Sequence, residues 1–288
     1  MDYDFLLEKR LMKEAPDLHR RVADSAVILQ QMLLSFLTWF PDFTDHSILH
    51  SLSVIDFCNQ LLGKQVNSLS IGECYVLLMS CYLHDSGMGI PKESFEEFSK
   101  GLDTSEYEKE HHNATIKERV RAFHNEYSGL FIKKYHSLFD IPSDDLLFAI
   151  VQVSRGHRKT NLYDENVYPD LETEYGIIRT AYLGAILRLA DEIDVGMDRN
   201  PELLFDKSNL PDQNAINYFG MHDSIKEVEI LEDKIVLHVK PKSDYFIPLI
   251  EDLAVKIQTT LDYCVDVADV RSSLKIYQKT IELLYMNA

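Results

Sequence analysis

The chain of 288 residues is 45% hydrophobic and 26% charged, the composition of a globular protein large enough to bury a substantial core. Its formal net charge of −18 argues against binding to long nucleic acids, because that binding needs clustered lysine and arginine. The longest apolar run, residues 27–40, is too short and too polar to span a membrane, and the acidic N-terminus is unlike a secretory signal, so we expect a cytoplasmic protein.

Most of the first 200 residues show the apolar spacing of helices. One helix is expected over residues 16–41, between two prolines, and a second from about residue 45 to 62. Ser70 and Glu73 form a capping box before a buried helix that ends in a His-Asp dipeptide. Three more helices follow, over residues 116–131, residues 144–155 and residues 177–193, the last of which is apolar nearly all round and so is expected to be central.

The C-terminal third has a different character. Residues 201–220 look like loop, residues 226–230 and 235–239 alternate as a β-hairpin, and two helices are expected over 248–267 and 272–285. The four cysteines stand singly in helical patterns without a CxxC motif and are expected to be reduced core thiols. We therefore expect a mainly α fold: a helical domain over residues 1–200 and a small α+β extension over 201–288 packed on it, leading on to a further domain.

Histidine and aspartate residues carry the main chemical signal. The dipeptide His84-Asp85 closes the buried helix and is followed at once by a helix-breaking segment, residues 86–91. Histidines and an aspartate on other expected helices complete an ordered set: His50, His84, Asp85, His124, His157 and Asp191. Each alone is more often structural, but unpaired imidazoles and carboxylates on apolar helices are costly to bury, and a shared metal removes that cost. A second dipeptide, His222-Asp223, follows no apolar helix, and we expect it to be unrelated to the site.

This order, H…HD…H…H…D, resembles the HD-domain metal-dependent phosphohydrolase superfamily over about residues 43–195, and implies an HD-type helical bundle. Residues 83–88 and 181–191 look most like its HD-CE group, modules of bacterial conflict and stress proteins that are often joined to an ATPase or another effector domain. In the family, residues matching His50, His84, Asp85 and Asp191 hold one metal. Histidines matching His124 and His157 hold a second, with Asp85 bridging. The resemblance thus implies one or two divalent ions: Mn, Fe, Co, Ni, Zn or Mg.

The resemblance also implies hydrolysis of a phosphate ester or anhydride by attack of a metal-bound hydroxide. With both extra histidines present, we favour a nucleotide or a short, including cyclic, oligonucleotide as the substrate. Three alternatives stay open: an HD-type nuclease, a deoxynucleotide triphosphohydrolase, and a non-catalytic, metal-stabilised sensing module of a larger conflict or stress protein. We expect a small phosphorylated partner, no membrane and no long nucleic acid, and we leave open an oligomer and a fused or separate ATPase or effector partner.

Residues near these ligands are candidates for catalysis and substrate binding. His46 stands four residues before His50, the spacing at which cyclic-nucleotide phosphodiesterases of the superfamily place a histidine that protonates the leaving oxygen; a polar helix end is the alternative. Arg155, Arg158 and Lys159 flank His157 and suit a substrate phosphate, or form a solvated helix end. We assign catalytic roles to His46, Asp85 and Arg158.

Two further expectations concern the surroundings of the ligands. Arg188, one turn before Asp191, either supports the ligands or forms an ion pair at the edge of the core. The glutamate-rich segment over residues 86–113 is expected to border the pocket as a lid, or else to be an acidic helical insertion on the surface.

Overall fold

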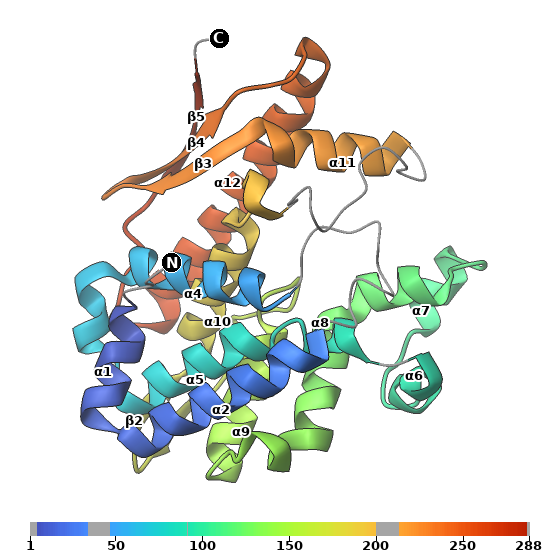
Figure 1. Ribbon diagram of the computed structural model, residues 1–288. Helices are drawn as coiled ribbons and strands as arrows, with labels where there is room; N and C mark the ends of the chain where they lie inside the picture. Colours follow the sequence, from blue (N-terminus) through green and yellow to red (C-terminus); the bar gives the residue numbers. More distant parts are fainter. Residues whose placement is uncertain (1–4, 34–46, 91, 200–212, 287–288) are drawn as a thin grey trace.

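Helix α10 (Thr180–Ile193) runs through the centre of the protein and is buried along nearly its whole length. Four other helices pack around it: α4 (Ile48–Leu62), α5 (Ile71–Leu83), α9 (Asp144–Arg155) and α12 (Ile247–Arg271). The computed structural model describes residues 5–33, 47–90, 92–199 and 213–286, and this part is mainly helical with two small sheets (Figure 1). The expected mainly α fold is confirmed.

Two N-terminal helices cover one side of α5. They are α1 (Leu6–Glu14) and α2 (Pro16–Leu33), and α2 begins at the proline that predicted its start. The predicted end of this helix at residue 41 lies outside the described residues. Helix α4 begins after Ser47, whose side chain accepts a hydrogen bond from Leu49 N, and Gly63 ends it with a φ of 50°. The predicted start at residue 45 also lies outside the described residues.

The predicted signals for the starts of the buried helices are confirmed. Ser70 and Glu73 form the capping box of α5, and Ser143 caps α9. Thr115 and Glu118 form a further capping box, not predicted from the sequence, at the start of α8 (Ile116–Tyr135). Between α5 and α8 lie short helices: η2 (Ser86–Gly89), α6 (Lys92–Ser99) and α7 (Ser105–Glu110). The 3-10 turns η1 (Gly63–Ser68), η3 (His136–Phe139), η4 (Met197–Arg199) and η6 (Asp244–Phe246) lie at other helix ends.

The helix predicted from residue 177 begins three residues later. Residues 176–179 form strand β2 (Gly176–Arg179), which pairs antiparallel with β1 (Asp170–Thr173). The carboxylate of Glu73 accepts hydrogen bonds from the backbone N and the guanidinium of Arg179. This long-range ion pair holds Arg179 outside the helix, a tertiary contact that the local apolar pattern does not contain.

Two predictions for the C-terminal part are wrong. Residues 213–224 form helix α11 (Gln213–Ser224) rather than loop, while residues 201–212 lie outside the described part. The predicted hairpin is confirmed as β3 (Ile225–Ile230) and β4 (Lys234–Val239). The segment predicted as a last helix is extended and ends in strand β5 (Thr280–Tyr285), parallel to β4. The spacing of its apolar residues fits both a helix and a strand. Pairing with the open edge of β4 favours the strand.

The three-stranded sheet, in the order β3-β4-β5, lies at one end of the bundle (Figure 1). Helix α12 connects it to the bundle, packing along α10 on one side and against β5 on the other. The division at residue 200 stays a prediction. All four cysteines are buried free thiols, as expected. Within the described residues, no helix is long and apolar enough to cross a membrane.

Candidate metal centre

Three helices and the ends of two others bring the predicted ligands together. His50 lies in the first turn of α4, His84 and Asp85 follow directly after the end of α5, and Asp191 lies in the last turn of α10. His124 follows a kink at Phe123 in α8, where φ is −122° and ψ is 17°. His157 follows the end of α9. The four histidines and Asp85 are buried. Their polar atoms therefore need partners.

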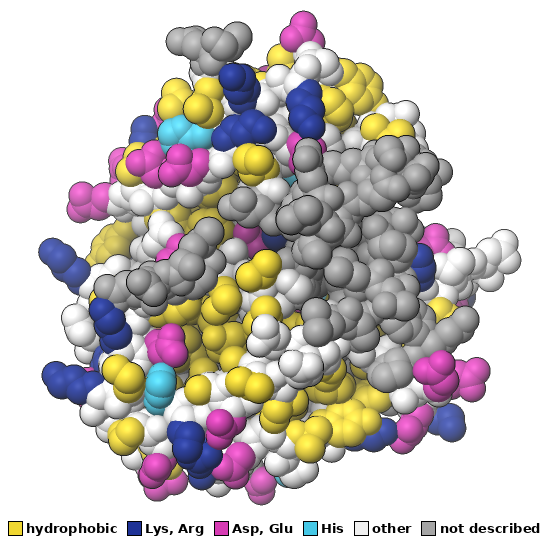
Figure 2. Space-filling view, viewed as in Figure 1, with side chains coloured by type: hydrophobic (Ala, Val, Ile, Leu, Met, Phe, Trp, Pro, Cys, Tyr) yellow, Lys and Arg dark blue, Asp and Glu magenta, His cyan; other side chains and the backbone are white. Residues whose placement is uncertain are grey.

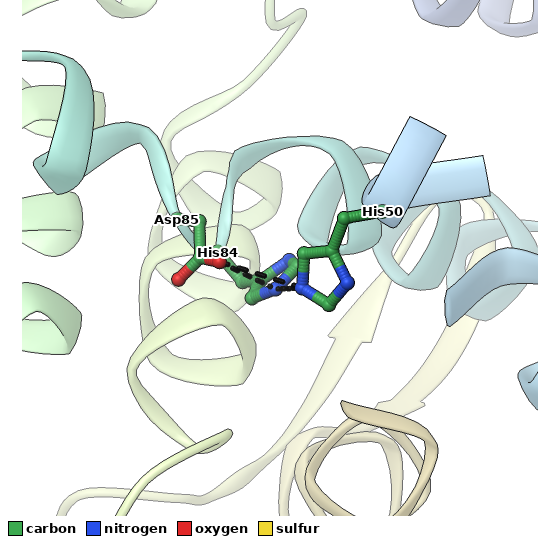
Figure 3. A group of neighbouring side chains, drawn as sticks. All are labelled: His50, His84 and Asp85. Atoms are coloured by element: carbon green, nitrogen blue, oxygen red, sulfur yellow. Dashed lines mark hydrogen bonds and ion pairs between the residues drawn. The ribbon is translucent and has the colours of Figure 1, made fainter. Parts of the chain in front are cut away.

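One group of donor atoms surrounds His50 and His84. Their Nε2 atoms lie 3.1 Å apart, and Asp85 Oδ2 is 3.4 Å from each (Figure 3). Asp191 Oδ1 lies 3.2 Å from His50 Nε2 and 3.7 Å from His84 Nε2. Two imidazoles and two carboxylates therefore converge on one point.

A second group surrounds the other two histidines. The Nε2 atoms of His124 and His157 lie 2.9 Å apart, and Asp85 Oδ1 is 3.5 Å from the first and 3.8 Å from the second. The two oxygens of Asp85 thus face different histidine pairs. This is the geometry of a carboxylate that bridges two ions, as the family resemblance implies.

The hydrogen bonds of the rings determine which nitrogen carries the proton. Nδ1 of His84, His124 and His157 each lies within 2.9 Å of a backbone carbonyl oxygen, which can only accept a hydrogen bond. Nδ1 of His50 lies 2.6 Å from the acceptor Asp194 Oδ2 and 2.8 Å from the donor Arg199 Nη1. In the neutral rings of His124 and His157, Nε2 then presents a lone pair, and the two lone pairs face one another. A cation between them turns this repulsion into coordination.

The spacing of the donor atoms also suits a metal ion. Nitrogen and oxygen ligands lie about 2.0–2.2 Å from a first-row divalent ion. Adjacent donors in tetrahedral or octahedral arrangement are then roughly 3.0–3.4 Å apart. The groups His50, His84 and Asp85, and Asp85, His124 and His157, each bring one ligand atom per residue within 4.8 Å of one another. The residues present fit divalent ions, and the identity of the ions is not determined by this donor set.

Electrostatics differ between the two groups. Burial and the Arg199 charge oppose protonation of His50, but hydrogen bonds to Asp191, Asp194 and Asp85 raise its pKa to about 9. Burial disfavours the carboxylate of Asp191, yet hydrogen bonds from His50 and His84 hold its pKa well below the usual range. Burial and the charges of His124 and His84 lower the pKa of His157 well below its usual value. The first group is therefore rich in carboxylates, which raise the pKa of both His50 and His84, and the second is a pair of neutral imidazoles.

Gly87 holds the two groups close together. A Cβ at this position would lie 2.5 Å from the carbonyl oxygen of His124 and 2.6 Å from the backbone N of Ser128. The backbone N of Gly87 donates to Ser128 Oγ at 2.8 Å. Only glycine allows the turn after Asp85 to press against α8 beside His124, so that both oxygens of Asp85 reach their histidines.

Arg188 supports the loop that carries His157. Its Nε donates to the carbonyl oxygen of Gly156 at 2.7 Å, and its Nη2 donates to that of Thr160 at 2.8 Å. The guanidinium also lies 4.8 Å from the centroid of the Tyr263 ring. Of the two predicted roles, support of the ligands is the one that these contacts favour.

Asp194 and Arg199 also belong to the centre, although the sequence analysis did not assign them. Asp194 accepts from His50 and from Arg199 Nη1, at 2.6 and 3.1 Å. Arg199 and His50 together hold the pKa of Asp194 below its usual value, although burial opposes this. The spacing of Asp194, three residues after Asp191, was the available signal, since it places both at the same end of α10. Arg199 carried no signal of its own.

A pocket opens onto the centre. The described residues enclose about 120 Å³, between the ligands Asp85, His124 and Asp191 and a second wall formed by the C-terminal part. That wall includes Tyr218 and His222 of α11. The expectation that His222-Asp223 is unrelated to the site is therefore wrong for His222, which α11 brings to the pocket by packing against η4 and α12.

The other predicted site residues lie in different places. Arg158 lines the pocket, and no described residue pairs with its guanidinium. Arg155 is engaged with Glu126, at 2.8 and 3.1 Å, and with Gln152, and it does not line the pocket. Lys159 is exposed and also lies outside the pocket lining. His46 lies outside the described residues.

The segment after the His-Asp dipeptide has two parts. Residues 86–89 touch α8 beside the ligands, and helices α6 and α7 continue along the outer side of α8 (Figure 1). Phe95 packs on Tyr127, and Tyr107 packs on Phe123. No described residue of α6 or α7 lines the pocket. These contacts fit the alternative of a helical insertion better than a lid.

A helical bundle that converges this ordered His and Asp set on two adjoining buried donor groups defines an HD-type domain. The family model described as HD-CE matches residues 40–271, most of the chain. The chain belongs to the HD-CE family, which confirms the resemblance seen in the sequence. Comparison with curated proteins and with solved structures finds no significant match.

Proposed function

We propose that this protein is a divalent-metal-dependent phosphohydrolase that acts on a nucleotide or a short, including cyclic, oligonucleotide. The observation that carries the proposal is the position of Asp85, whose two oxygens face two separate histidine pairs. A carboxylate shared in this way would hold two ions close enough to bind one phosphoryl group. Ions held there would polarise a phosphoryl oxygen and make a water molecule acidic enough to attack near neutral pH.

The protein's own residues have definite tasks in this proposal. The hydrogen bonds at Nδ1 of the four histidines fix the rings in orientations in which Nε2 would bind an ion. Asp191 adds a carboxylate to the first group, and its low pKa keeps it ionised. Arg158, at the pocket wall, binds a phosphate oxygen of the substrate.

The charge distribution supports a small substrate. Acidic side chains are interspersed with the basic ones on the face shown in Figure 2, and the chain carries a net charge of −18. Such a surface repels a long polyanion, whereas a local metal pair with Arg158 still attracts one or a few phosphates. The pocket of about 120 Å³ is smaller than the roughly 300–1,000 Å³ of sites that enclose a whole small molecule. It suits the reacting phosphoryl group and its nearest neighbours.

The test is metal analysis followed by a substrate screen. The purified chain is loaded with Mn, Co, Ni, Zn or Mg and assayed on nucleoside mono-, di- and triphosphates, cyclic nucleotides and cyclic dinucleotides. Arg158→Ala is expected to raise KM about tenfold with a smaller loss in kcat, as for a contact to a non-reacting phosphate. Lys133→Ala, an exposed lysine on α8, is the control. Degradation of long nucleic acids without turnover of small substrates would contradict the proposal.

A second candidate is a sensing module with structural metals. The extensive burial of the first group, with His50 and His84 nearly inaccessible, favours it. Full metal occupancy with tight nucleotide binding, but no turnover of any substrate in the screen, would select it over the hydrolase.

A further inference from the structure

The wall of the pocket opposite the ligands has its own chemistry. It is formed by residues of the C-terminal part: Tyr218 and His222 on α11, and Leu253 and Lys256 on α12. Lys256 is paired with Glu192 at 2.7 Å, so its charge is compensated. What remains is a tyrosine ring, a leucine and an imidazole, which is a wall for an uncharged group rather than for a phosphate.

His222 presents a hydrogen-bond acceptor on this wall. Its side chain is buried, and Nδ1 donates to the carbonyl oxygen of Val195 at 2.8 Å, which leaves the lone pair on Nε2. No described residue donates to that Nε2. Burial and the charge of Arg199 lower the pKa of His222 to about 4, so the ring is neutral near pH 7. An acceptor on a pocket wall is available to a ligand with a suitable O–H or N–H.

We infer that His222 is a substrate-binding residue, whose Nε2 accepts a hydrogen bond from a sugar hydroxyl of a ribonucleotide, next to the reacting phosphoryl group. This inference rests on the proposed function and names its substrate class. A lone pair repels phosphate oxygens, so the partner is a donor. Because the pocket is small, that donor lies close to the phosphoryl group, where a nucleotide has its sugar hydroxyls.

Two residues beside His222 complete the contact. The ring of Tyr218 lies 4.5 Å from that of His222 at an angle of 60°, which fixes the imidazole from the side. Leu253 is buried and apolar. Together they offer a surface for the carbon face of the sugar, with one acceptor for its hydroxyl.

A matched pair of substitutions isolates this acceptor. In His222→Asn the short amide keeps a donor near the position of Nδ1, for Val195, but removes the acceptor at the position of Nε2. In His222→Gln the longer side chain places its carbonyl oxygen near the position of Nε2. Melting temperature and metal content are measured for both, and His222→Gln keeps the test available if the asparagine variant does not fold.

The probes are AMP, 2′-deoxy-AMP and 3′-deoxy-AMP, and the readout is their dissociation constant for the metal-loaded full chain by calorimetry. The wild-type protein is expected to bind AMP about tenfold more tightly than one of the two deoxy analogues. His222→Asn should weaken the binding of AMP to the level of that analogue and leave the affinity for the analogue unchanged. His222→Gln should retain most of the preference.

Equal binding of the three probes to the wild type, or equal losses for all three in His222→Asn, would overturn the inference.

Failure of the proposed function gives a different result. If no substrate is hydrolysed but the preference for the hydroxyl depends on His222, the inference stands and the hydrolase proposal falls. If nucleotides are hydrolysed without any dependence on His222, the hydrolase stands and the inference falls. Absence of binding of all three probes would overturn both.

Discussion

The Nε2 atoms of His124 and His157 lie 2.9 Å apart, although the other nitrogen of each ring donates to a backbone carbonyl. Two neutral rings in these tautomers have no proton to share across that distance. His50 and His84 also bring their Nε2 atoms together, at 3.1 Å, beside carboxylates that raise the pKa of both rings. This repeated arrangement, rather than the presence of histidines alone, indicates two cation sites.

The first prediction concerns Asp85, which faces both sites. Asp85→Asn keeps the shape of the side chain but removes its charge, and we expect the purified protein to lose both divalent ions, because each site loses its only shared carboxylate. Elemental analysis after dialysis measures the ions per chain. His112→Ala, an exposed histidine after α7, is the control and should retain the wild-type content. Wild-type metal content in Asp85→Asn would remove the bridging role.

The second prediction separates the two sites. His157→Ala should lose the ion next to His124 while keeping the ion held by His50, His84 and Asp191, so that about one ion per chain remains. His50→Ala should do the reverse. Metal content and the stoichiometry of Mn²⁺ binding by calorimetry check both variants. If His157→Ala retains two ions, or if either variant loses both, the two groups do not act as separate sites.

The third prediction concerns the turn after Asp85. Gly87→Ala places a methyl group 2.5 Å from the carbonyl oxygen of His124, and because both neighbours are backbone atoms the segments must separate. We expect a loss of about 2–3 kcal/mol in the free energy of unfolding and weaker metal binding. Urea denaturation and metal titration measure these effects.

Gly196→Ala is a matched control for this change, since a Cβ there meets no atom within 4 Å. It should alter the unfolding free energy by less than about 0.5 kcal/mol. Equal stability of the two variants would show that the close approach of η2 to α8 does not constrain the centre.

The sequence predicted the parts of the fold whose signals are local. Ser70 with Glu73 marks the start of α5 and Gly156 marks the end of α9, because capping uses only neighbouring residues. The wrong predictions concern segments whose state depends on distant partners. Strand β5 forms by pairing with β4, which lies about 40 residues earlier in the chain. Arg179 lies outside the predicted helix because its side chain is paired with Glu73.

The site follows the same division. Its ligands were found because they recur in a fixed order along the chain, which is a property of the sequence. Asp194, Arg199 and His222 join the site only through the packing of α10, η4 and α11, and apart from the spacing of Asp194 from Asp191 no local pattern marks them. His222 is the clearest example, because no pattern in the sequence marks it and yet it lines the pocket.

The last prediction concerns the pH dependence of stability. The pKa of His222 is about 4 in the folded protein, below its ordinary value of 6.5. The unfolded chain therefore binds a proton at this residue when the pH falls below about 6.5, whereas the folded protein does so only near 4. The wild type should lose stability through this residue as the pH falls across that window, by about 3 kcal/mol in all. His222→Asn does not titrate and escapes the loss. Urea denaturation of both proteins between pH 7 and pH 4, with EDTA present so that metal binding does not contribute, measures the difference. The wild type's advantage over the variant should shrink as the pH falls, and a difference that stays constant would mean that His222 is not held neutral in the folded protein.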